Sequence, residues 1–340
     1  MVLALPPEIL RMIFADVDDR KTLCNILITS QQFSHLVEQF LYARIVLTGM
    51  SLPKTITRLA SLNAILESSN GRRARYVRNL CFGPPQGEED RSLINKILTQ
   101  TVNLKDLTLH IFPHMFPQSF SQVPQFALTS LHVTFHSLDP SLHHFLESQT
   151  SLETLYLGLA VRYAKDLPAF SPTSFPNLKT LSIVSLQLHA FLPTLVRVTH
   201  LRVGGNYRDS GEIALCMGTV RVLSCPDTHT VTSMNLLLPN LEWLELLNPT
   251  STTTLIAWCP HILKLRGVRL PRFHTPSSHQ DMRCLFDTIR TLEFVELREG
   301  PDFTLKRWYR DAAAPAPIRW LCKPRREWLG DWVKDVVGVE

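Results

Sequence analysis

A six-residue pattern, leucine-x-x-leucine-x-leucine, recurs along this 340-residue chain and constrains its fold more than any other feature. Ten copies centre on Leu80, Leu107, Leu131, Leu155, Leu181, Leu201, Leu223, Leu244, Leu265 and Val295. Successive centres lie 20 to 30 residues apart, close to the period at which repeated units stack into solenoids. Because side chains two apart on a strand point the same way, each copy predicts a short strand with one apolar face.

Such strands are stable only when neighbouring copies stack beside them, so the pattern predicts a parallel sheet with a continuous leucine core. We therefore expect an α/β fold in which an irregular leucine-rich-repeat solenoid carries a parallel concave sheet of about ten strands. Connecting segments at 90–100, 140–149 and 252–259 look helical, whereas 113–126 is too rich in proline for a regular helix. The alternative is a set of leucine-rich helices that match the pattern by chance.

The composition narrows the class of protein. Apolar residues make up 45% of the chain and charged residues 19%, which argues against disorder. The formal net charge of +5 is weak evidence for a polyanionic partner, so we do not expect nucleic acid to bind. We find neither a signal peptide nor an apolar segment long enough for a membrane helix, and seven cysteines without C-x-x-C spacing predict reduced thiols. These features favour the cytoplasm, the nucleus or both, without a membrane partner.

No catalytic, nucleotide-binding or cofactor motif is present, so we expect neither an enzyme nor a cofactor. Two histidine pairs, His110 with His114 and His132 with His136, have a spacing that suits a metal site on a helix. Both pairs begin on predicted strands, where residues four apart are separated by more than about 12 Å. We therefore expect exposed or hydrogen-bonding histidines and no metal.

The first 48 residues lack the repeat and show helical spacing of apolar side chains instead. Residues 8–17 form the first predicted helix, which follows two prolines that suit a first turn. Asp18 or Asp19 can cap a second helix over 21–30, and a third helix is expected over 34–45. A three-helix unit of this size is marginal alone, so it needs the solenoid or a partner for stability.

One ordered set of residues runs through this segment: Leu5-Pro6-x-Glu8-Ile9-Leu10, Ile13-Phe14, an acidic turn, Leu23, Leu36-Val37 and Leu41-Tyr42. Over about residues 3–47, this order resembles an F-box. F-box proteins with C-terminal leucine-rich repeats are substrate receptors of SCF-type ubiquitin ligases. Their F-box docks on a Skp-type adaptor, which links the receptor to a cullin–RING scaffold.

The resemblance implies roles for particular residues. The positions expected to contact the adaptor or to shape that interface are Leu5, Pro6, Glu8, Ile9, Ile13, Phe14 and Leu23. The alternative is that these side chains only pack the three helices together. Phe33 stands where many F-boxes carry a tryptophan near the start of the third helix.

We divide the chain into an F-box (1–48), a linker helix (49–74), the leucine-rich-repeat solenoid (75–300) and a tryptophan-rich C-terminal cap (301–340). The basic cluster Arg72, Arg73, Arg75 and Arg78 is either a solvated edge or a phosphate site. The C-terminal tryptophans are Trp308, Trp320, Trp328 and Trp332. They cover the last leucine layer or, alternatively, form an aromatic and basic surface for a ligand or nucleic acid.

The residue after each central leucine should face the concave side, where a partner would bind. That column reads Cys81, Thr108, His132, Tyr156, Ser182, Arg202, Ser224, Glu245, Arg266 and Glu296. Because Trp and Arg are favoured in binding hot spots, we expect substrate contacts at Arg202, Trp243, Glu245, Lys264 and Arg266. The alternative is an ordinary solvated face with ion pairs such as Glu245 with Arg266.

The leading functional hypothesis is a non-catalytic substrate-recognition subunit of an SCF-type E3 ubiquitin ligase, whose repeats hold an unknown protein substrate. A ligase-independent repeat scaffold for protein–protein interaction is the main alternative. An RNA- or phosphate-binding repeat protein is a third.

Overall fold

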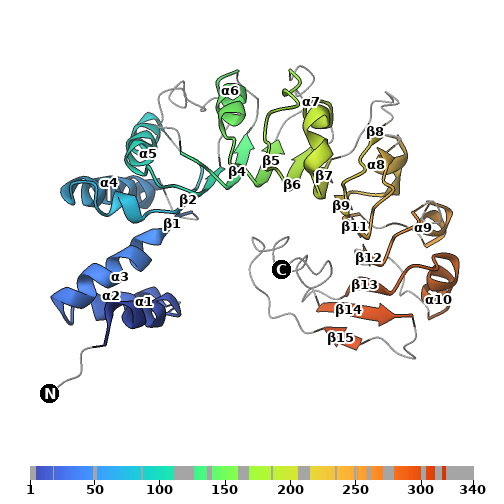
Figure 1. The fold of residues 1–340 in the computed structure, drawn as a ribbon, viewed down its shortest axis with the longest axis horizontal. Coiled ribbons are helices and arrows are strands. Elements are labelled where there is room, and N and C mark those ends of the chain that lie inside the picture. Colours follow the sequence, from blue (N-terminus) through green and yellow to red (C-terminus); the bar gives the residue numbers. More distant parts are fainter. Residues whose placement is uncertain are drawn as a thin grey trace. The chain divides into compact units, whose positions relative to one another are not determined.

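The computed structural model describes residues 5–17, 19–48, 52–85, 87–110, 126–135, 140–159, 168–184, 187–205, 215–233, 236–248, 250, 252–258, 262–270, 279–299, 304–310 and 316–318. The chain forms two compact units, Met1–Gly204 and Gly205–Glu340 (Figure 1).

The first unit begins with the three helices that the sequence predicts: α1 (Pro7–Ala15), α2 (Arg20–Leu27) and α3 (Gln31–Ala43). Capping side chains determine where helices α2 and α3 begin. The carboxylate of Asp19 accepts hydrogen bonds from the backbone N–H groups of Lys21 and Thr22, and Ser30 Oγ accepts one from Phe33 N at 3.1 Å. These caps satisfy amide groups that have no partner within the helix.

The three helices share one apolar core, made of Leu10, Phe14, Leu23 and Val37. The rings of Phe14 and Phe33 meet edge to face, with centroids 5.8 Å apart. Phe33 thus holds α3 against α1.

The prediction that the third helix reaches Ile45 is wrong. The helix ends at Ala43, and Arg44–Leu47 forms strand β1, which pairs in parallel with β2 (Asn79–Phe82) and places Ile45 opposite Leu80. Ile45 and Val46 are β-branched and suit a strand once the edge of β2 is available. The sheet therefore begins with β1, within the N-terminal segment that was predicted to be wholly helical.

After helix α4 (Leu52–Ser68), the first unit continues as parallel strands in chain order. They are β2, β3 (Asp106–His110), β4 (Ser130–Phe135), β5 (Thr154–Leu159), β6 (Thr180–Val184) and β7 (His200–Gly204). The central leucines lie opposite one another in every pair, as the repeat predicts. They are buried, so each strand directs one face into a shared core.

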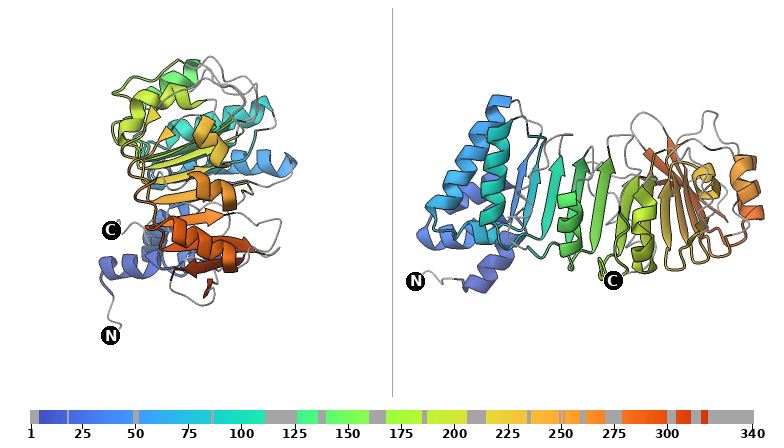
Figure 2. Two further views of the ribbon diagram at one scale, coloured as in Figure 1. Left: turned by 90° about the vertical axis from the view of Figure 1, so that its right-hand side faces the viewer. Right: turned by 90° about the horizontal axis from the view of Figure 1, so that it is seen from above.

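Helices α4, α5 (Glu88–Gln100), α6 (Pro140–Ser148) and α7 (Leu188–Phe191) lie on one side of these strands (Figures 1 and 2). The helices expected at 90–100 and 140–149 are confirmed, and residues 113–125 lie outside the described part. We call the side away from these helices the helix-free face. It carries the residues immediately before and after each central leucine, because side chains alternate along a strand.

The second unit repeats the arrangement with β9 (Val222–Cys225), β11 (Trp243–Leu246), β12 (Gly267–Leu270) and β13 (Phe294–Glu299) in parallel. Two further strands, β14 (Thr304–Tyr309) and β15 (Ala316–Ile318), continue it in antiparallel pairing. Its helices are α8 (Thr228–Ser233), α9 (Thr252–Trp258) and α10 (His279–Thr288), and the two-residue strands β8 (Leu215–Cys216) and β10 (Leu236–Leu237) pair separately.

One repeat centre was predicted three residues too early. Val268, rather than Leu265, pairs with Leu244 and Val295, while Leu265 is the buried leading leucine of the same pattern. The local sequence fits both registers, and only pairing with β11 and β13 selects one. The corrected register places Arg269, in place of Arg266, in the column after the central leucines.

The fold class is confirmed: a helical N-terminal domain precedes a mostly parallel sheet, as expected for stacked repeats. Trp308 lies on β14 opposite Val295 and is buried, so one of the C-terminal tryptophans covers the last parallel strand. The other three, Trp320, Trp328 and Trp332, lie outside the described residues.

Candidate functional site and protein-docking surfaces

Helix α1 and the residues before it present an apolar surface to solvent. Leu5, Ile9, Met12 and Ile13 are 50%, 42%, 67% and 47% exposed, and their spacing of three to four residues places them on one side of the helix. The opposite side holds Leu10 and Phe14 in the core. A cluster of large apolar side chains that remains exposed in a folded domain is typical of a protein-binding surface.

The residues expected to serve docking fall into two groups. Leu5, Pro6, Glu8, Ile9 and Ile13 are exposed, so their side chains are available to a partner. Phe14 and Leu23 are 5% and 4% exposed and lie in the helical core, so they offer a partner very little accessible surface. They shape the surface by holding α1 and α2 together.

The sequence analysis missed two exposed apolar residues. Met12 extends the surface of α1, and Ile28, which directly follows α2, is the most exposed large apolar side chain among the described residues. Helical spacing was a sufficient signal for Met12, since it lies three residues after Ile9.

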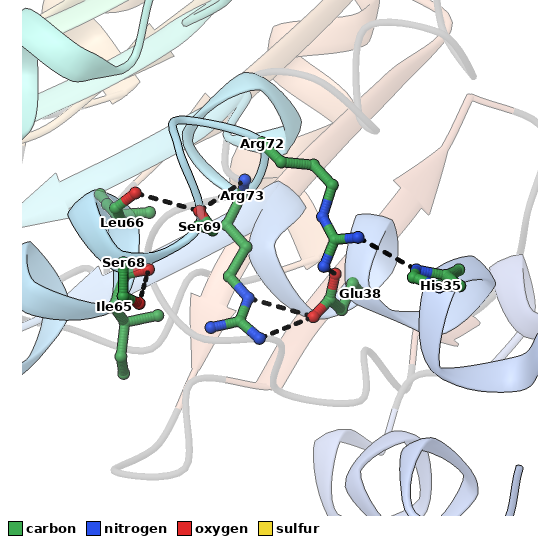
Figure 3. Close-up of polar contacts among 8 residues, drawn as sticks. All are labelled: His35, Glu38, Ile65, Leu66, Ser68, Ser69, Arg72 and Arg73. Carbon is green, nitrogen blue, oxygen red and sulfur yellow. Dashed lines mark hydrogen bonds and ion pairs between the residues drawn. The ribbon is translucent and has the colours of Figure 1, made fainter. Parts of the chain in front are cut away.

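An ion-pair cluster joins α3 to the turn that follows α4 (Figure 3). Glu38 is 3% exposed and accepts from Arg72 Nη2 at 2.8 Å and from Arg73 Nε and Nη2 at 3.0 and 2.8 Å. Arg72 Nη1 also lies 3.1 Å from His35 Nδ1. The hydrogen bond to Glu38 is the main cause that raises the pKa of Arg73. These contacts argue against a phosphate site at Arg72 and Arg73, because both guanidinium groups are engaged by Glu38, while Arg75 and Arg78 are exposed, as a solvated edge would be.

Another arginine, Arg20, connects the N-terminal helices to the sheet. Arg20 Nη2 donates to Leu41 O at 3.2 Å and to Arg44 O, which lie at the end of α3 and the start of β1. A cation at this position compensates carbonyl groups that have no partner within the helix. Both contacts fix the N-terminal helices relative to the strands of the same unit.

Residues 2–60 match the family model described as the COS11 F-box domain. This segment is similar to an F-box domain. The match includes α1 to α3, β1 and part of α4, so it confirms the resemblance noted in the sequence and extends it beyond residue 47. F-box domains bind Skp-type adaptors in SCF complexes. A comparison with curated proteins found no match.

In the second unit, the tryptophan at the centre of the surface that the sequence predicted is buried. Trp243 is completely buried and packs with Val222 and Phe294, so an exposed hot spot at this residue is wrong. Lys264 and Arg266 are exposed, but they lie before β12 rather than within the expected column. Lys264 Nζ donates to Asn240 Oδ1 at 2.6 Å, and Arg266 Nε pairs with Glu293 Oε1 at 2.8 Å.

The charged residues within these later strands neutralise one another. Arg269 Nη2 lies 2.7 Å from Glu296 Oε2 and Arg269 Nη1 lies 3.6 Å from Glu245 Oε1. Arg307 Nε donates to the other Glu296 oxygen at 3.0 Å. The predicted pair of Glu245 with Arg266 is therefore wrong, because Arg269 occupies the paired position.

The corresponding column in the first unit has the predicted register. Thr108, His132, Tyr156, Ser182 and Arg202 lie opposite one another on successive strands. Among the residues described, no group of three or more His, Cys, Asp or Glu side chains is arranged to hold a metal ion, and no helix could span a membrane. His114 and His136 fall outside the described part.

Proposed function

We propose that this chain is the substrate-recognition subunit of an SCF-type E3 ubiquitin ligase. In this proposal the F-box docks on a Skp-type adaptor, the adaptor links the chain to a cullin–RING scaffold, and the repeats bind a protein substrate. The chain itself is non-catalytic and acts in the cytoplasm, the nucleus or both. The observation that carries the proposal is the exposed apolar side of α1 within a segment that matches an F-box domain.

The energetics support docking through this surface. Burying an exposed Leu or Ile side chain contributes about 1.5 to 3 kcal/mol, and Leu5, Ile9 and Ile13 are already about half buried. Each would therefore add about 1 kcal/mol on binding, and together they would supply a substantial part of a micromolar affinity. The core residues beneath keep α1 in place, so little ordering cost accompanies the contact.

The test is a pull-down of the full chain with a Skp-type adaptor. Ile9→Asp and Ile13→Asp each place a charge in the apolar surface, and we expect at least a tenfold loss of adaptor binding. Val196→Asp is the matched control, because Val196 is also exposed and apolar but lies just before β7. Equal recovery of adaptor by all variants, or no recovery by the wild type, would contradict the proposal.

Addition of a cullin–RING scaffold then separates a ligase subunit from a ligase-independent scaffold. A complex of chain, adaptor and cullin supports the ligase subunit. Adaptor binding that excludes the cullin would favour the scaffold instead.

A further inference from the structure

Three side chains that carry rings lie next to one another on neighbouring strands, on the helix-free face of the first unit. His110, His132 and Tyr156 come from β3, β4 and β5, and all are half-buried. The ring centroids of His110 and His132 lie 5.7 Å apart, and those of His132 and Tyr156 lie 3.8 Å apart. Flat rings in contact form a stiff surface, which loses little conformational entropy when another side chain packs on it.

A guanidinium group stands two strands away from Tyr156 in the same column. Arg202 on β7 is half-buried, and among the described residues it makes neither an ion pair nor a side-chain hydrogen bond. The described arginines that pair with a carboxylate include Arg73, Arg269 and Arg307. A half-buried charge without a partner has lost part of its hydration, so an incoming anion would be favoured there.

The charges on this face also favour an anion. Among the described residues of β1 to β7, the charged side chains on this side are Arg44, Arg202 and Asp106, so two cations stand against one carboxylate. Burial raises the pKa of Asp106, although a hydrogen bond from Thr129 opposes the shift. A partner with negative charge therefore complements the face.

The same column in the second unit has the opposite character. Ser224, Glu245, Arg269 and Glu296 are all buried, and the charged members pair with one another or with Arg307. No net charge remains there to attract a partner. In the first unit Ser182 is buried, but Thr108, His132, Tyr156 and Arg202 are only half-buried, so this column is the better docking surface.

We infer that the helix-free face of Met1–Gly204 binds an extended acidic peptide segment of a partner protein, with a carboxylate at Arg202 and an apolar or ring side chain on the His132–Tyr156 pair. If the proposed function holds, this segment belongs to the substrate, and in that respect the inference rests on it. Two strand spacings, about 10 Å, separate Tyr156 from Arg202 along this column, and an extended chain covers this distance in about three residues. The segment should therefore carry an acidic residue about three positions from an apolar or aromatic one.

The probe is an array of synthetic peptides of about twelve residues with random sequences, incubated with the full chain. We expect the bound peptides to be enriched in Asp or Glu about three positions from Pro, Phe, Tyr or Trp. Versions with Lys in place of the acidic residues should not bind. Arg202→Gln and Tyr156→Ala should each weaken binding at least tenfold. Arg197→Gln is the matched control, because Arg197 is exposed in the turn before β7.

The inference is overturned if no peptide binds, if basic peptides are selected, or if Arg202→Gln binds as the wild type does. Preferential binding of a single-stranded RNA oligonucleotide, lost in the same variants, would also overturn it. The adaptor pull-down, repeated with Arg202→Gln, distinguishes this result from failure of the proposed function. If the chain binds peptides but not the adaptor, the ligase proposal is wrong and the peptide site remains. If the chain binds the adaptor and Arg202→Gln binds peptides as the wild type does, only the peptide site is wrong.

Discussion

The indole ring of Trp243 lies against Gly267 on the neighbouring strand. A Cβ atom at position 267 would stand 2.3 Å from ring atoms Cε3 and Cζ3 of Trp243 and 2.9 Å from Phe294 Cζ. The missing side chain allows the indole to meet the Phe294 ring, with centroids 5.1 Å apart. A tryptophan whose position in the repeat suggests exposure is buried for this reason.

Gly267→Ala should therefore destabilise the second unit by about 1 to 3 kcal/mol, because the added methyl group forces Trp243 or the strands to move. Chemical denaturation of the full chain, followed by tryptophan fluorescence, measures the change. Gly218→Ala is the matched control: a Cβ atom at position 218 would meet no other atom within 4 Å, so we expect a change within about 0.5 kcal/mol. Equal effects of the two substitutions would contradict this account.

Glu38→Gln should weaken the junction between the F-box and the first repeats. The substitution removes the carboxylate that holds Arg72 and Arg73, and since the arginines are partly exposed we expect a loss of about 2 kcal/mol in the free energy of unfolding. Glu88→Gln provides the comparison, because its carboxylate is 89% exposed and pairs with Arg91 at 3.2 Å. That change should cost less than about 1 kcal/mol. Thermal unfolding of both variants measures the two losses of stability. A larger loss for Glu88→Gln than for Glu38→Gln would refute the argument.

Glu296→Gln should be more costly, by about 3 to 5 kcal/mol, because it leaves Arg269 and Arg307 near each other without their shared carboxylate. A double-mutant cycle with Arg307→Met tests the cause. If the charge pair is responsible, the coupling energy should exceed about 1 kcal/mol. Simple additivity of the two single changes would show that packing, rather than charge, explains the loss.

The stability of the second unit should fall in alkaline solution through Cys225. Burial, with smaller contributions from Asp227 and Glu245, raises the pKa of this thiol well above its ordinary value. Above about pH 8.5 the unfolded thiol releases a proton that the folded one retains, so unfolding is favoured by about 1.4 kcal/mol per further pH unit. The contribution is absent below that pH and grows until the folded thiol itself ionises.

Denaturation of the wild type and of Cys225→Ala between pH 8 and pH 10 measures this difference. The cavity lowers the stability of the variant at pH 8, but the variant should lose stability less steeply as pH rises. Parallel slopes would show that Cys225 ionises as readily in the folded chain as in the unfolded one. Cys24 and Cys284 are exposed and serve as internal controls for alkylation, which should spare Cys225.

Much of the fold was predictable from local patterns. The spacing of Ile9 and Ile13, with Asp19 and Ser30 as caps, was sufficient to predict helices, and the alternation of leucines was sufficient to predict strands. The two errors in strand and helix assignment arose where a short stretch fitted two structures. Ile45 suits a helix or a strand, and Leu265 suits two positions in the repeat; pairing with distant segments selected one in each case.

The sequence was enough to establish which strand side chains point toward the helices, because successive residues of a strand point to opposite faces. Helical spacing and the order of the motif residues were enough to recognise the F-box. Which groups on the other face remain available depends on the folded chain. Trp243 is covered because Gly267 makes room for it, and Arg269 is neutralised because Glu296 and Glu245 flank it on neighbouring strands. Arg202 lacks such a neighbour among the described residues. Exposure and charge compensation depend on residues that are brought together from different repeats, so no single repeat contains the information that separates a binding surface from an internal ion pair.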